Sequence, residues 1–128
     1  MVIIDGLNFN LMFIEYIRLR KNCIMIKKTY VKKNNSYRVT FKLEFEVESE
    51  DIYLCGDFNE WNTKQYKMKR LKKGGYSKTI ELSPGEKYHF KYFLGGDNWV
   101  NDDKADEYVS NEYGQEDSVV VIPEIPTE

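Results

Sequence analysis

The 128-residue sequence predicts a single all-β domain, an antiparallel β-sandwich of about seven strands. Apolar and polar residues alternate over several short runs, which is the period of a half-buried strand. Turns containing glycine or proline separate these runs at regular intervals, and no helical pattern lies between them. Short antiparallel strands of this kind bury their apolar faces when two sheets pack together.

The longest run begins near Tyr37 and carries the strongest strand pattern. Between Val39 and Val47, apolar residues occupy every second position and alternate with threonine, lysine and glutamate. This period of two predicts one long strand with a buried face and a solvated face. The acidic sequence "ESED" at residues 48–51 then turns the chain.

Shorter apolar runs predict the remaining strands. They lie at residues 52–55, 68–71, 76–82, 87–94 and 118–122. Turns follow at Gly74-Gly75, at Pro84-Gly85 and in the sequence "GGDN", which leads the chain back through Trp99. The polar, acidic stretch at residues 101–115 has no strand pattern, and its acidic side chains are predicted to lie in a solvated loop.

The first 24 residues depart from this pattern, so the domain is predicted to span residues 25–128. The segment is apolar and aromatic, but Asp5, Glu15 and Arg18 interrupt it. It falls short of the roughly 20 apolar residues of a membrane-spanning helix, and it lacks the cleavage site of a signal peptide. Three readings stay open: a short N-terminal helix that docks on the domain, a helix that binds a membrane surface or a partner, and sequence upstream of a start at Met25.

The composition argues against several classes of partner and site. The net charge is −2, so nucleic acid and anionic membranes are not expected partners. Cys23 and Cys55 are too few for a disulfide framework or a zinc site, and they favour a reducing, cytoplasmic location. The acidic residues between 97 and 107 lack the spacing of a calcium loop, and no metal or cofactor is expected. Six basic residues between 64 and 73 are predicted to be solvated.

Four segments in order carry a resemblance to a known family. They are "VTFKLEF", "IYLCGDFNEWN", "LSPGEKYHFKYFLGGDNWVND" and "GQEDSVVVI", and the resemblance that they carry extends over about residues 25–122. The sequence resembles carbohydrate-binding module family 48, the early-set immunoglobulin-like domain that precedes the catalytic barrel of isoamylases and glycogen branching enzymes. It is also similar to the glycogen-binding domain of the AMP-activated protein kinase β subunit. The resemblance implies an immunoglobulin-like sandwich.

The resemblance further implies that an α-1,4-glucan (glycogen, starch or a maltooligosaccharide) binds on one open sheet face. Two tryptophans and a lysine match family positions that stack on glucose rings and hydrogen-bond their hydroxyls. Asp117 stands where the family has an asparagine, two further contact positions differ from the kinase version, and the turn before Trp99 is one residue longer. The candidate carbohydrate-binding residues are Trp61, Lys91, Trp99, Tyr113, Gln115 and Asp117.

The chemistry of these residues is compatible with sugar binding. An indole offers a flat, rigid partner for the apolar face of glucose, and Lys91 offers donors to hydroxyl oxygens. Strand alternation places His89 and Lys91 on the face opposite Phe90 and Tyr92. Trp61 has a competing reading as a core or loop-pinning residue, and Trp99 as a cap on one end of the sandwich.

The neighbours of Trp61 in its loop have expected structural roles. Phe58 is predicted to join the core. Asp57 and Asn59 are predicted to hold the loop through hydrogen bonds to backbone.

The sequence therefore predicts a non-catalytic α-glucan-binding module. No motif sets two carboxylates across a pocket, as glycoside cleavage requires, and 128 residues are too few for the roughly 250-residue barrel that holds the chemistry in the related enzymes. Two alternatives stay open. One is a regulatory or structural protein-interaction domain of the same fold without sugar affinity. The other is an accessory part of a glycan-branching or debranching system, with a glycan-metabolising enzyme as partner.

Overall fold

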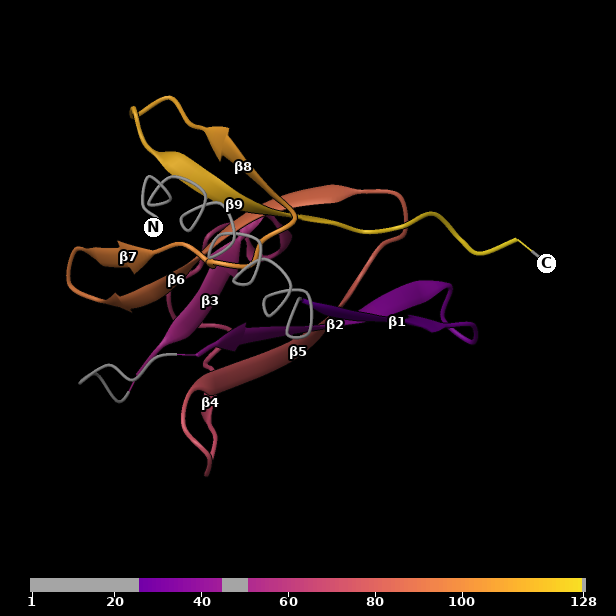
Figure 1. The fold of residues 1–128 in the computed structure, drawn as a ribbon, viewed down its shortest axis with the longest axis horizontal. Helices are drawn as coiled ribbons and strands as arrows, with labels where there is room; N and C mark the ends of the chain where they lie inside the picture. Colours follow the sequence, from indigo (N-terminus) through magenta and orange to yellow (C-terminus); the bar gives the residue numbers. More distant parts are fainter. Residues whose placement is uncertain (1–25, 45–50, 128) are drawn as a thin grey trace, which may run out of the picture.

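Two antiparallel sheets form the protein, as shown by a computed structural model that describes residues 26–44 and 51–127 (Figure 1). The described strands are β1 (Lys27–Val31), β2 (Ser36–Leu43), β3 (Tyr53–Gly56), β4 (Lys69–Arg70), β5 (Tyr76–Leu82), β6 (Lys87–Gly95), β7 (Asn98–Val100), β8 (Glu107–Ser110) and β9 (Glu116–Val121). A short 3-10 helix, η1 (Asp57–Asn59), follows β3. The predicted all-β antiparallel sandwich is confirmed. The predictions for residues 1–24 and for the end of the first long strand lie outside the described residues.

The strand order defines the two layers. One sheet has the order β1-β2-β5-β4, and the other has the order β3-β6-β9-β8, with β7 also paired to β6. Every strand pairing is antiparallel. Strand β6 therefore pairs with three neighbours, β3 on one edge and β7 and β9 on the other, which makes it the centre of the five-stranded sheet.

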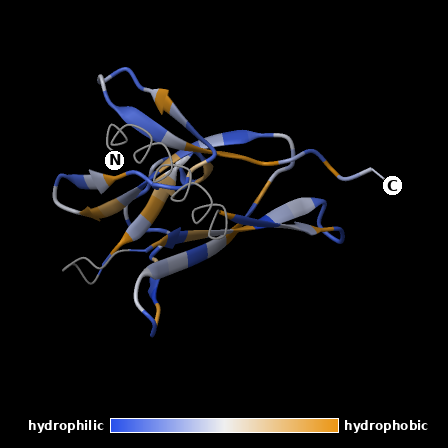
Figure 2. Ribbon diagram, viewed as in Figure 1, coloured by the Kyte–Doolittle hydropathy of each residue, from blue (hydrophilic) through white to orange (hydrophobic). Residues whose placement is uncertain are grey.

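The core lies between the sheets and follows from strand alternation. On β2, Val39, Phe41 and Leu43 are buried while Arg38 and Lys42 are exposed, as the period of two predicts. Figure 2 shows hydrophobic residues along β3 and β6 and hydrophilic ones at the β1–β2 turn.

Aromatic rings join the two sheets across this core. The rings of Phe41 on β2 and Phe90 on β6 meet edge to face, with their centroids 4.9 Å apart. This is one of the arrangements that aromatic pairs prefer. The partly buried ring of Phe58 packs against Phe41, so its predicted place at the core is confirmed.

The sequence analysis missed two strands, β1 and β8. Both lie at sheet edges, where a strand pairs on one side only. β1 reads "KKTYV" and β8 reads "EYVS", so charged residues occupy positions that a central strand fills with apolar ones. Charged, short edge strands are common because they discourage pairing with other chains, and for the same reason they carry little apolar periodicity.

The prediction that the acidic stretch is solvated is wrong for Asp102. Its side chain is buried, with 2% exposure, and one carboxylate oxygen accepts a hydrogen bond from the Tyr92 hydroxyl at 2.5 Å. The same hydroxyl also lies 3.3 Å from the Lys42 carbonyl on the other sheet. Burial raises the pKa of Asp102, and burial together with the nearby Asp102 charge raises the pKa of Tyr92. Asp102 therefore ties the 101–106 segment to the end of the sandwich.

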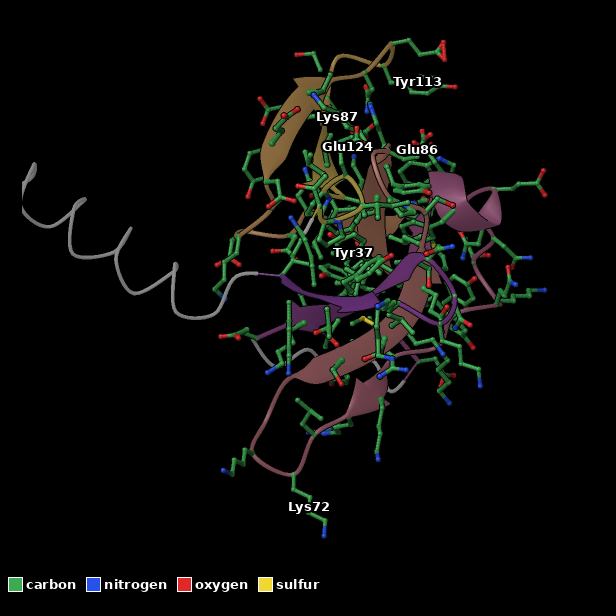
Figure 3. All side chains as sticks on the ribbon, turned by 90° about the vertical axis from the view of Figure 1, so that its right-hand side faces the viewer. Tyr37, Lys72, Glu86, Lys87, Tyr113 and Glu124 are labelled. Carbon is green, nitrogen blue, oxygen red and sulfur yellow. The ribbon has the colours of Figure 1, made fainter. Side chains whose placement is uncertain are left out.

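The basic residues between 64 and 73 are exposed, as predicted. Lys72, at the tip of the β4–β5 hairpin, and Tyr113 lie at opposite ends of the view in Figure 3. Within residues 26–44 and 51–127, no helix has the length and hydropathy needed to span a membrane.

Replacing Asp102 with alanine is expected to lower the free energy of unfolding by about 1–3 kcal/mol, because the buried Tyr92 hydroxyl loses its closest acceptor. Urea denaturation measures the change. The matched control is Asp103→Ala, which removes an exposed neighbour and is expected to stay within about 0.5 kcal/mol of the parent protein. Equal effects of the two substitutions would contradict a structural role for Asp102.

Candidate functional site

A cleft of about 690 Å³ lies on the five-stranded sheet, between the loop after β3, the strand β7 and the β8–β9 hairpin. All six residues that the sequence analysis selected line it: Trp61, Lys91, Trp99, Tyr113, Gln115 and Asp117. Three residues that it did not select also line the cleft, namely Asp57, Asn111 and Glu112. Segments far apart in the sequence are therefore brought to one place by the sheet.

The loop after β3 is tightly built against β6. A Cβ atom on Gly56 would lie 2.4 Å from the His89 carbonyl oxygen, so only glycine fits at this crossing. Asn59 is buried; its side chain accepts from the Gly56 amide at 3.0 Å and donates to the Leu54 carbonyl at 3.2 Å. Asp57 accepts from the His89 amide at 2.8 Å. The predicted backbone hydrogen bonds of Asp57 and Asn59 are thus present.

This loop carries Trp61 out of the core and into the cleft. Glu60 and Trp61 both have left-handed backbone angles, with φ of 54° and 57°, which is rare for a bulky residue. The Trp61 amide donates to the Gly56 carbonyl at 2.9 Å, and its indole Nε1 donates to Asp57 at 3.2 Å. The half-buried ring is therefore pinned to its loop while it lines the cleft.

Trp99 lies beside Trp61. The two indole centroids are 6.2 Å apart and the ring planes are inclined by 61°. Behind Trp99 lies Phe93, its cross-strand partner on β6, with ring centroids 4.6 Å apart. Trp99 retains 36% exposure, and Gly95 and Gly96 in the preceding turn have positive φ angles. The two indoles form one angled aromatic wall, which we call the indole wall.

The opposite, polar side of the cleft is organised by Asp117. One of its oxygens lies 3.0 Å from His89 Nδ1, and the other accepts from the Asn111 side chain at 3.0 Å and lies 3.7 Å from the Lys91 ammonium. Lys91 also donates to Gln115 at 3.4 Å. Partial burial raises the pKa of Asp117, but the hydrogen bonds from His89 and Asn111 and the charge of Lys91 outweigh it, so the net pKa is lowered.

Asn111 shapes the hairpin that closes the cleft. Its side-chain oxygen accepts from the Tyr113 amide at 2.9 Å and from the Gln115 amide at 3.1 Å, which folds residues 111–115 into a compact turn. Tyr113 projects from this turn with 81% exposure (Figure 3). The asparagine and glycine in "NEYG" are a turn signal that could have identified Asn111. Nothing in the sequence pattern marks Glu112.

The side chains in the cleft suit recognition of a neutral polar ligand. Aromatic faces line one side, while hydrogen-bonding groups of lysine, glutamine and carboxylates line the other. Among the described residues, no three histidine, cysteine, aspartate or glutamate side chains are grouped to hold a metal ion.

Comparison with known proteins places these residues in a family context. A family model described as the glycogen recognition site of AMP-activated protein kinase matches residues 39–127, which is more than half of the chain and includes every residue that lines the cleft. No curated protein matches the sequence.

The lowered pKa of Asp117 predicts a defined acid sensitivity. Its ionised form stabilises the fold above the unfolded-state pKa of about 3.9, and this contribution is lost as the pH falls through the lower folded-state pKa. Asp117→Asn is therefore expected to lose less stability than the parent protein between about pH 5 and about pH 2. Thermal unfolding across this range measures the difference. Identical acid dependence in the two proteins would contradict the prediction.

Proposed function

Because the chain belongs to the family of the glycogen recognition site of AMP-activated protein kinase, we propose that its cleft binds α-1,4-glucan chains by stacking glucose rings on Trp61 and Trp99. The family is a carbohydrate-binding module, a non-catalytic type of domain. The observation that carries the proposal is the indole wall, with its two rings 6.2 Å apart, facing a polar cluster in the same cleft.

The indole wall fits the shape of the ligand. A glucose ring has an apolar face of C–H groups that packs on an indole. The two ring planes are inclined by 61°, so one flat rigid surface cannot lie on both. Successive units of an α-1,4-linked chain are turned relative to each other, because the chain curves. Such a chain can therefore offer one sugar face to each indole.

The polar side provides the hydroxyl contacts. Gln115 is exposed and has both donors and an acceptor for sugar hydroxyls. Lys91 lines the cleft although it is only 9% exposed, and its three donors can serve a sugar hydroxyl in addition to Asp117 and Gln115. Asp117 is only 8% exposed and both of its oxygens have protein partners, so it acts mainly by holding Lys91 and the hairpin in place. Tyr113 contributes an exposed aromatic face to the cleft. We expect dissociation constants between roughly micromolar and millimolar.

The acidic groups in the cleft favour binding without cleavage. Glycoside hydrolysis needs a carboxylic acid with a raised pKa opposite a second carboxylate. The pKa of Asp117 is instead lowered, and Asp57 is engaged by Trp61 and by the His89 amide. A chain that binds without cleaving would bring a glycan-metabolising enzyme to the polymer, and such an enzyme is the partner we propose.

Trp61→Ala and Trp99→Ala are each expected to weaken binding to maltoheptaose and glycogen at least about fivefold, because each removes one stacking surface worth ~1 kcal/mol or more. Titration calorimetry and migration in glycogen-containing native gels measure the loss. Ile125→Ala is the matched control, since it removes an exposed apolar side chain that does not line the cleft. Unretarded migration of the parent protein in every α-glucan would instead favour a protein-interaction domain.

The purified chain is expected to release no reducing ends from glycogen, amylopectin or maltoheptaose. The reason is that the pKa of Asp117 is lowered and that Asp57 is held by Trp61 and the His89 amide, so neither is arranged as the general acid that cleavage needs. A reducing-sugar assay over long incubation tests this, with heat-denatured protein as the blank. Time-dependent release that scales with protein concentration would show that the chain is an enzyme.

A further inference from the structure

The charges lining the cleft are unbalanced. Three carboxylates, those of Asp57, Glu112 and Asp117, face it together with a single ammonium group, that of Lys91. Three negative charges and one positive charge leave a formal excess of two negative charges.

The one ammonium group is already compensated. Lys91 Nζ lies 3.7 Å from Asp117 and 3.4 Å from the Gln115 side-chain oxygen, and its side chain is only 11% exposed. A ligand anion would therefore compete with an existing carboxylate for this charge. Glu112, in contrast, is exposed at the edge of the cleft.

None of the basic residues between residues 64 and 73 lines the cleft. Lys72, at the tip of the β4–β5 hairpin, lies at the far end of the molecule from Tyr113 in Figure 3. Interactions between exposed charges are largely screened beyond a Debye length of about 8 Å at physiological salt. The charged side chains that line the cleft therefore dominate its local potential, and the carboxylates among them outnumber the ammonium group.

We propose that the cleft selects neutral α-glucan chains and rejects chains that carry phosphate esters, with Glu112 as a specificity-determining residue at its edge. This inference rests on the proposed glucan binding. A phosphate ester brings about −1.5 to −2 charges at neutral pH. Placed in the cleft, it would meet carboxylates and would lose hydration without gaining a cationic partner, whereas neutral hydroxyl groups meet the same carboxylates as hydrogen-bond acceptors.

The test compares maltoheptaose with maltoheptaose that carries one phosphate ester on an internal 6-hydroxyl group. Binding can be followed by intrinsic fluorescence, because the only two tryptophans of the sequence both line the cleft. At low salt the phosphorylated ligand is expected to bind about five- to tenfold more weakly, and the ratio is expected to shrink towards unity at about 0.5 M salt. If the ratio of the two affinities does not change with salt concentration, the proposal is overturned, because the weaker binding would then reflect steric exclusion rather than charge.

Two variants isolate the contribution of Glu112. Glu112→Lys is expected to improve binding of the phosphorylated ligand at least about threefold relative to neutral maltoheptaose, whose affinity is measured in parallel. The matched control is Glu86→Lys, which makes the same charge change in the β5–β6 turn, at the opposite end of the five-stranded sheet from β7 (Figure 1), and is expected to change neither. Equal gains in the two variants, or no gain in Glu112→Lys, would overturn the role of Glu112.

The outcomes separate this inference from the function on which it rests. Equal affinity for the neutral and phosphorylated ligands overturns the selectivity and leaves glucan binding intact. Failure of neutral maltoheptaose to bind overturns the proposed function, and the selectivity with it.

Discussion

The alternation of side chains along β6 is the constraint on which the rest of the structure depends. Phe90 and Tyr92 point into the core and are fully buried, while Lys91 between them points into the cleft. Because β6 pairs with β3, β7 and β9, its register also fixes where Trp99 and Asp117 lie. A shift of one residue would turn the two core rings towards the cleft and the ammonium group into the apolar core, so core packing and site geometry enforce the same register.

The aromatic and polar sides of the cleft are held in different ways. On the aromatic side, Gly56 allows the loop to approach β6, and a left-handed backbone carries Trp61 outward at a conformational cost that the loop's hydrogen bonds offset. On the polar side, Asp117 joins β6, β9 and the β8–β9 hairpin through its two oxygens. Both sides are therefore organised without a ligand, which lowers the entropy cost of ordering side chains on binding.

Charge is distributed unevenly over the domain. The residues lining the cleft carry an excess of negative charge, while the basic residues between residues 64 and 73 are exposed outside the cleft. Under the proposed function, a neutral polysaccharide binds through contact with the indole wall and through hydrogen bonds. The charge of the cleft then acts only on ligands that carry charged groups.

The sequence by itself determined the all-β class, the central strands and the six candidate residues. Val39, Phe41 and Leu43 follow a period that only a strand can bury, and Trp61, Lys91 and Trp99 lie in motifs that resemble a known family. It could not reveal the edge strands β1 and β8, the burial of Asp102, or the parts of the cleft formed by Asn111 and Glu112. Those features depend on contacts between residues distant in the chain. An edge strand forms by pairing with a strand elsewhere in the sequence, and the buried carboxylate of Asp102 accepts a hydrogen bond from the hydroxyl of Tyr92. Local periodicity records which face of a segment is buried, whereas only the tertiary structure decides what that face meets.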